Sequence, residues 1–177
     1  ELVEIGGGFR IPEVIVQGGA RLCEVGTTNR TRVNDYRDAV GPETAAFLKV
    51  HRSNFDIVGF TEEAEIPELA ELSRETGIPL VDDLGSGAMT DAYGPGLGGE
   101  PLVRRHLAEG ADLICFSGDK LFGGPQAGII LGRGDLVAKI RKHPLMRALR
   151  PCKLTLTALE ATFELWRDER TSEIPVA

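Results

Sequence analysis

The chain has 177 residues, with 20 Lys and Arg against 27 Asp and Glu, so its formal charge is −7. Hydrophobic residues make up 42% and charged residues 27%, and no apolar run approaches the roughly 18 residues that cross a bilayer. This composition excludes membrane-spanning and disordered proteins, and the length predicts one domain or most of one. The acidic balance argues against a broad surface for nucleic acid and leaves room for a local basic patch.

The three cysteines, Cys23, Cys115 and Cys152, are an odd number without a C-x-x-C spacing. This pattern indicates neither a disulfide framework nor a zinc site, and it is typical of a reducing compartment. The chain begins at Glu1 without a signal peptide. We therefore expect a cytoplasmic protein, present here as a fragment or a processed chain.

Short apolar runs bounded by Gly, Pro, Asn or Asp alternate with longer amphipathic segments. The runs predict strands, in chain order, at residues 21–25, 45–50, 78–82, 112–116 and 128–131. Alternation of strands with helices is typical of an α/β domain, with helices flanking a mostly parallel sheet.

The helices are predicted from apolar residues spaced three and four apart. In chain order they cover residues 66–72 with a stop at Gly77, 102–108 with a stop at Gly110, 135–142, 145–150 and 154–166. The last helix carries an apolar stripe that requires a partner in the core, made of Leu156, Leu159, Phe163 and Trp166.

A glycine-rich stretch at residues 94–99 matches G-x-G-x-x-G, the fingerprint of dinucleotide-binding loops. That fingerprint requires a strand before it and a helix on its last glycine, and neither is predicted here. Pro95 also lacks the N–H that such a loop offers to a phosphate. A flexible loop is therefore favoured.

Lys120 lies in a glycine-rich segment that follows one apolar strand and leads into another. Ligands of open α/β sheets bind outside the carboxyl ends of the strands, which is where this lysine is expected. A lysine there can form a Schiff base with an aldehyde. Ser117, three residues earlier, is a candidate phosphate contact. The alternative is an ordinary solvated loop lysine.

Asp83 ends a second apolar strand, directly after Asp82 and before the turn 85–87. A lysine and an acid are the two groups that pyridoxal 5'-phosphate (PLP) chemistry demands, one to anchor the aldehyde and one to hold a protonated pyridine nitrogen. The pattern alone favours this interpretation no more than the alternative, in which Asp83 is a turn-capping carboxylate.

Six segments resemble the bacterial L-seryl-tRNA(Sec) selenium transferase (selenocysteine synthase) family, in the same order and over nearly the whole chain. They are ELVEIGGGFRIP (1–12), EVGTTNRT (24–31), KVHRSNF (49–55), DDLGSGAM (82–89), FSGDKLFGGPQAGII (116–130) and HPLMRALR (143–150). The resemblance implies part of the large domain of aspartate-aminotransferase-like, fold type I PLP enzymes, with a mostly parallel sheet of seven strands. Lys120 would bind PLP covalently, Asp83 would face the pyridine nitrogen and Ser117 would contact the phosphate.

The resemblance also implies anion binding by Arg147 and Arg150, whose spacing of three would place both guanidiniums on one face of a helix. The implied reaction converts seryl-tRNA(Sec) to selenocysteinyl-tRNA(Sec) with selenophosphate, by β-elimination and then selenium addition. The implied assembly is a homo-oligomer, a ring built of dimers. Two alternatives stay open, namely a related PLP-dependent lyase acting on a small amino acid and a noncatalytic fragment.

Members of this family are longer than this chain. We therefore expect residues 1–150 to be a PLP-binding portion of the large domain and residues 151–177 to be a helix that leads toward a C-terminal small domain. Two polar strand ends are weaker candidates for the site or for a subunit contact: Thr27, Thr28, Asn29 and Arg30, and His51, Ser53 and Asn54. The histidines show no metal-ligand spacing.

Overall fold

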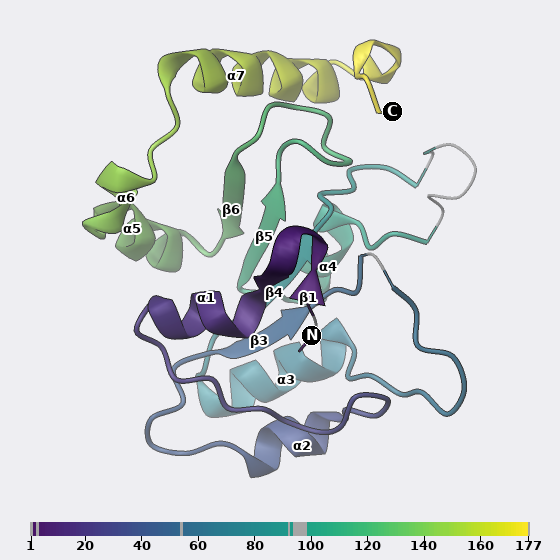
Figure 1. Ribbon diagram of the computed structural model, residues 1–177, viewed down its shortest axis with the longest axis vertical. Coiled ribbons are helices and arrows are strands. Elements are labelled where there is room, and N and C mark those ends of the chain that lie inside the picture. The colour runs from purple at the N-terminus through teal and green to yellow at the C-terminus, as the bar shows by residue number, and fades with distance from the viewer. Residues whose placement is uncertain (1, 3, 54, 92, 94–98, 177) are drawn as a thin grey trace.

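The computed structural model describes residues 2, 4–53, 55–91, 93 and 99–176 (Figure 1). The strands are β1 (Glu4–Ile5), β2 (Phe9–Arg10), β3 (Phe47–Val50), β4 (Leu80–Gly85), β5 (Leu113–Ser117) and β6 (Gly128–Gly132). The helices are α1 (Ile11–Gln17), α2 (Val33–Asp38), α3 (Ile66–Thr76), α4 (Val103–Glu109), α5 (Gly134–Lys142), α6 (Leu145–Ala148) and α7 (Lys153–Arg167). Two short 3₁₀ turns, Gly6–Gly8 and Thr171–Glu173, complete the described elements.

The main sheet has the strand order β3-β4-β5-β6. The first three strands are parallel, and β6 runs antiparallel to β5. The prediction of a mostly parallel α/β sheet is therefore confirmed. Of the seven strands that the family resemblance implies, this sheet contains four. Because β3, β4 and β5 are parallel, their carboxyl ends lie at the same edge of the sheet.

Four of the five predicted strands form as β3 to β6, within a few residues of the expected bounds. The prediction of a strand at residues 21–25 is wrong. That segment joins no ladder, and most of its side chains are exposed. Strand-like composition does not suffice where no neighbouring strand offers hydrogen-bond partners. The helices α1 and α2 were not predicted, because each spans only about two turns.

Helices α3 and α4 cover the face of the sheet on which Leu80 and Leu84 lie. In α3, Glu65 and Glu68 form a capping box at the start, and Gly77 ends the helix with a φ of 73°. Ile66, Leu69 and Leu72, at most 1% exposed, point from α3 into the core. The remaining core members lie on α3, α4, α7, the sheet strands and the loops between them: Phe47, Ala64, Ala70, Leu80, Leu84, Val103, Ala111, Ile114, Phe116, Phe122 and Leu159.

Helix α7 crosses above the ends of β5 and β6 (Figure 1). Leu159 is buried in the main core, and the indole N–H of Trp166 donates to the backbone oxygen of Phe122 at 2.9 Å. The ring of Phe163 lies 4.8 Å from that of Phe122, although 45% of Phe163 is exposed. Leu156 is half exposed, so the predicted apolar stripe is only partly buried.

The predicted helix at residues 145–150 ends early, at Ala148. Most of the glycine-rich stretch 94–99 lies outside the described residues. In the part of the chain that the structure describes, no helix is both long enough and apolar enough to cross a membrane.

Candidate active site at the carboxyl end of the sheet

The carboxyl ends of β4 and β5 lead into two tight turns that lie against each other. Strand β4 continues into residues 85–87, where Gly85 and Gly87 have φ values of 64° and 72°. A Cβ on Gly87 would lie 2.5 Å from the ring of Phe116, so only glycine fits there. The backbone N–H of Leu121, in the turn after β5, donates to the oxygen of Ser86 at 3.0 Å. This hydrogen bond holds the two turns together.

Lys120 lies in the turn after β5, and its side chain is exposed. Its Nζ lies 3.7 Å from the point that a Cβ on Gly85 would occupy. Any longer side chain at Gly85 would therefore compete with the amine for space. The structure thus places a reachable primary amine over the end of β4.

Asp83 lies on the same side of β4 as Gly85, and its side chain is half-buried. Burial raises the pKa of its carboxyl group, and the negative charge of Asp82 adds to the rise. The N–H of Gly85 and the charge of Lys120 act in the opposite direction without cancelling the effect. Lys120 is thus close enough to Asp83 for an electrostatic interaction, as the sequence suggested.

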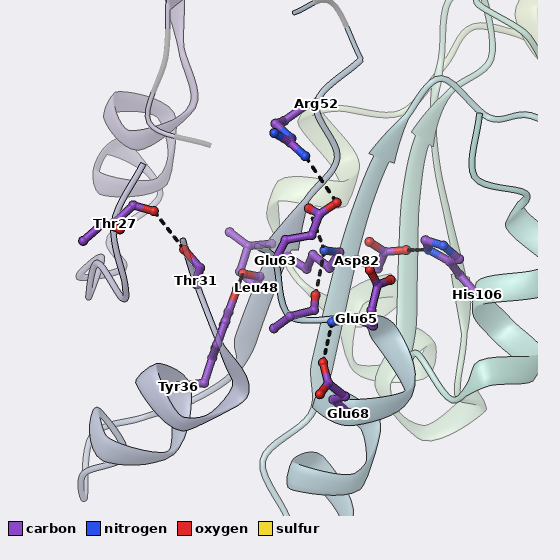
Figure 2. Close-up of polar contacts among 12 residues, drawn as sticks. Thr27, Thr31, Tyr36, Leu48, Arg52, Glu63, Glu65, Glu68, Asp82 and His106 are labelled. Atoms are coloured by element: carbon purple, nitrogen blue, oxygen red, sulfur yellow. Dashed lines mark hydrogen bonds and ion pairs between the residues drawn. The ribbon is translucent and has the colours of Figure 1, made fainter. Parts of the chain in front are cut away.

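Asp82 points to the opposite face of β4 and is fully buried. Its Oδ2 lies 2.7 Å from Nδ1 of His106 on α4, as Figure 2 shows. Its Oδ1 has no hydrogen-bond partner among the described residues, and the same holds for the buried hydroxyl of Ser86. The sequence reasoning missed His106. Alternation along β4 separates the two aspartates, but no local pattern identifies a partner 24 residues away.

Ser117 is the last residue of β5. Its hydroxyl donates to Oδ1 of Asp119 at 2.5 Å, within the same turn as Lys120. Ser117 therefore lies at the same edge of the sheet as Lys120, and its hydroxyl already has an acceptor within the protein.

Arg147 lies on α6, whereas Arg150 follows the end of that helix. The expectation that both project from one helix face is therefore wrong, because the four-residue helix includes Arg147 and ends before Arg150. Both side chains are exposed, and within the described part of the chain neither has an ion-pair partner. In Figure 1, α6 lies next to α5, beyond the edge strand β6.

The other polar strand ends have different surroundings. The N–H of His51 donates to the oxygen of Asp83 at 2.9 Å, and its Nε2 faces Oε2 of Glu100 at 3.3 Å. Asn54 lies outside the described residues. Thr27 forms the expected polar turn by donating to the oxygen of Arg30 at 2.9 Å. Residues 21–26, directly before that turn, form no strand.

Cysteine and metal chemistry have little support at this edge of the sheet. Burial, with smaller contributions from Asp83 and Asp82, raises the pKa of the Cys115 thiol to about 11. Such a thiol is protonated at neutral pH and is a poor nucleophile. The described residues contain no group of three or more His, Cys, Asp or Glu that could hold a metal ion.

The groups at this edge match the chemical requirements of PLP. The cofactor needs a primary amine for its aldehyde, an acid for its ring nitrogen and donors for its phosphate. Lys120 supplies the amine, Asp83 supplies a half-buried acid, and Ser86 has a buried hydroxyl that lacks a hydrogen-bond partner. The residues present therefore fit the cofactor.

The sequence model of the L-seryl-tRNA selenium transferase family matches residues 1–177. The chain belongs to this family. The L-seryl-tRNA(Sec) selenium transferase of Solidesulfovibrio magneticus is 61% identical over 168 residues, which cover 95% of this chain and 36% of the relative. That of Geobacter sulfurreducens is 57% identical over 177 residues, which cover 99% of this chain and 38% of the relative. The chain thus spans less than two fifths of the length of these relatives.

A solved structure of D-glucosaminate-6-phosphate ammonia-lyase superposes with a TM-score of 0.71 at 25% identity. The match covers 93% of this chain and 41% of the lyase. The predicted fold class, an incomplete aspartate-aminotransferase-like large domain, is confirmed by this similarity together with the observed sheet. The chain is therefore similar both to a transferase family and to a lyase.

Proposed function

We propose that this chain is the cofactor-binding core of a PLP-dependent transferase. The enzyme would convert seryl-tRNA(Sec) to selenocysteinyl-tRNA(Sec) with selenophosphate, by loss of the seryl hydroxyl and addition of selenium at the same carbon. The family membership supports the reaction, and the observation that carries the proposal is the placement of the Lys120 amine over the end of β4, beside Asp83. Residues 1–150 would belong to the large domain, and 151–177 would lead toward a small domain.

Lys120 has two tasks in this proposal. Its amine would hold the cofactor covalently, and the free amine would remove the proton from Cα of the seryl group. Both tasks require an amine that reaches the substrate. The exposed position of Lys120 in the turn after β5 meets that requirement.

Asp83 would hold the proton on the pyridine nitrogen of the cofactor. When bound, PLP supplies an electron sink that stabilises negative charge at Cα of the substrate. A carboxylate sustains that property because its charge favours the protonated ring. The half-buried position of Asp83 strengthens this interaction, since solvent screens it less.

Arg147 and Arg150 bind the phosphate of the selenium donor. Their guanidiniums are exposed and without ion-pair partners among the described residues, so both are available to an incoming anion. Because α6 ends at Ala148, the backbone after the helix, rather than helical spacing, would direct Arg150 to the anion. Arg150 thus acts from a loop.

The partners in this proposal are seryl-tRNA(Sec) and further copies of the chain. With a charge of −7, this segment is poorly suited to grip tRNA by itself, so the tRNA-binding surface would lie on other parts of the enzyme. Homo-oligomers built from dimers are consistent with exposed apolar side chains such as Val58 and Phe60, which are 94% and 83% exposed. Light scattering of the purified protein tests the assembly, and a stable monomer would contradict it.

The test of the cofactor site is borohydride reduction of the protein incubated with PLP, followed by peptide mapping. We expect one pyridoxyl label on Lys120 and none in Lys120→Ala. Lys142→Ala, which removes an exposed lysine of α5, should keep the label. A label on a different lysine in the wild-type protein would overturn the assignment.

A lyase acting on a small amino acid is the second candidate, favoured by the similarity to the ammonia-lyase structure. The two candidates differ in their need for tRNA. The assay uses the longest natural form of the protein. A selenium transferase should turn over only seryl-tRNA(Sec) with selenophosphate, whereas a lyase should release ammonia from a free amino acid. Ammonia release without tRNA would favour the lyase.

A further inference from the structure

Asp82 is an acid in a place where an apolar residue would be expected. Its neighbours on the same face of β4, Leu80 and Leu84, are fully buried, as is Asp82 itself. Burying a carboxyl group is costly, and it stabilises a fold less than a well-packed apolar side chain does. The best-attested benefit of a buried polar pair is a specific geometry. Asp82 is therefore expected to fix the position of the group with which it pairs.

The partner of Asp82 is His106 on α4, at 2.7 Å, and the side chain of His106 is only 13% exposed (Figure 2). A hydrogen bond this short and this well buried allows little movement of either group. Because Oδ1 of Asp82 has no hydrogen-bond partner among the described residues, His106 is the only described hydrogen-bond partner of that carboxyl group.

Helix α4 is joined to the chain on both sides of the 85–87 turn. Before the turn, His106 holds Asp82. After the turn, the N–H of Val103 donates to the oxygen of Ala88 at 3.0 Å. The turn lies between these two attachments, and β4 shifts its register against β5 between Asp83 and Gly85. Such an irregularity leaves the turn with fewer ladder hydrogen bonds of its own.

The geometry points to His106 as a positioning residue. Through Asp82 it holds the end of β4 and the 85–87 turn, and so keeps Asp83 beside Lys120. The Lys120 turn is held in the same way, because the N–H of Leu121 binds the oxygen of Ser86. The inference rests on the proposed function only for what Asp83 and Lys120 do.

Hydrogen exchange of the cofactor-free protein tests the positioning directly. In His106→Leu, which replaces the hydrogen-bonding ring with an apolar side chain, we expect the Leu121 amide to exchange about tenfold faster, as loss of one buried hydrogen bond allows. The Leu80 amide, bonded to Asp112 at the other end of the strand, should not change. His106→Asn, whose amide can replace Nδ1–H, should restore Leu121 to within about threefold of the wild type.

Val103→Ala is the matched control, because it removes buried methyl groups from the same helix without touching Asp82. It should speed exchange at Leu80 and Leu121 together, as general destabilisation does. If His106→Leu gives that same uniform pattern, or leaves Leu121 unchanged, His106 has no positioning role and the inference is wrong.

Labelling of Lys120 distinguishes failure of the inference from failure of the proposed function. If PLP binds at Lys120, His106→Leu should raise the PLP concentration for half-maximal labelling about tenfold, equivalent to about 1.4 kcal/mol. Wild-type protein that takes no label, yet whose Leu121 amide responds to His106→Leu, would contradict the proposed function and support the positioning. Normal labelling and normal exchange in His106→Leu would overturn the inference alone.

Discussion

Aspartates lie at both ends of the β4–β5 strand pair, and their pKa values are shifted in opposite directions. At the amino end, Asp112 accepts hydrogen bonds from the N–H of Leu80 at 2.8 Å, the hydroxyl of Ser73 at 2.9 Å and Nη1 of Arg133 at 2.9 Å. Burial opposes ionisation of Asp112, but these partners outweigh it and lower its pKa. At the carboxyl end, burial dominates and raises the pKa of Asp83.

The difference separates the part of the sheet that holds the fold together from the part that offers chemistry. Asp112 links α3, β4 and the residue after β6 to the start of β5, and both of its carboxylate oxygens have hydrogen-bond partners. At the other end, Oδ1 of Asp82 and the hydroxyl of Ser86 are buried without hydrogen-bond partners among the described residues, and the amine of Lys120 is exposed. Unused hydrogen-bonding capacity in a buried place is a feature of binding sites.

The largest expected effect is on stability at the amino end. Asp112→Ala leaves Leu80 and Ser73 without their acceptor, so we expect the free energy of unfolding to fall by about 3 kcal/mol in urea denaturation. Asp135→Ala is the control, because the ion pair between Asp135 and Arg133 is exposed on both sides, and its loss should cost less than about 1 kcal/mol. Equal losses in both variants would contradict the structural role of Asp112.

At the carboxyl end, Asp83→Asn should change activity rather than stability. In the longest natural form of the protein, turnover should fall about 100-fold, which corresponds to about 2.7 kcal/mol, because an amide cannot favour a protonated ring nitrogen by charge. Asp82→Asn, which keeps an oxygen for His106, should stay within about fivefold of the wild type. Loss of turnover in Asp82→Asn alone would transfer the assignment to Asp82.

Arg147→Ala and Arg150→Ala extend the comparison to a region outside both strand ends. Each change should raise the half-saturating concentration of selenophosphate about tenfold, since each removes one charged partner of its phosphate. Labelling of Lys120 should stay normal in both variants. Arg141→Ala, on the neighbouring α5, is the control. Variants that lose the label but saturate normally with donor would indicate a cofactor contact instead.

The smallest expected effect is on the pH dependence of stability, and it has opposite signs at the two ends. Because the pKa of Asp112 is lowered in the fold, Asp112 stabilises the fold above about pH 4. This stabilisation is lost as the pH falls through the lowered pKa. Because the pKa of Asp83 is raised in the fold, Asp83 contributes stability below about pH 4. This contribution is lost as the pH rises through the raised pKa. Urea midpoints at pH 3 and 7 should differ less in Asp112→Asn than in the wild type, and more in Asp83→Asn. Parallel responses would contradict the comparison.

Much of the carboxyl end could be predicted from the sequence. Lys120 and Asp83 each follow an apolar run, and parallel strands bring their carboxyl ends to one edge, so their proximity follows from topology alone. Arg150 shows the limit of such reasoning. Its spacing from Arg147 matches a helix, but α6 ends before it, because the final bounds of a short helix depend on its surroundings.

The sequence by itself determined the elements whose signals are local: the sheet strands β3 to β6, the long helices α3 and α7, and the glycine that ends α3. Tertiary structure decided what depends on partners far along the chain. Residues 21–25 have a strand-like composition but no neighbouring strand, so they form no ladder. Asp82 and Asp83 are adjacent in sequence, yet β4 turns one toward His106 and the other toward Lys120. Local periodicity gives the direction of each side chain, whereas only the packed fold supplies the group that it meets.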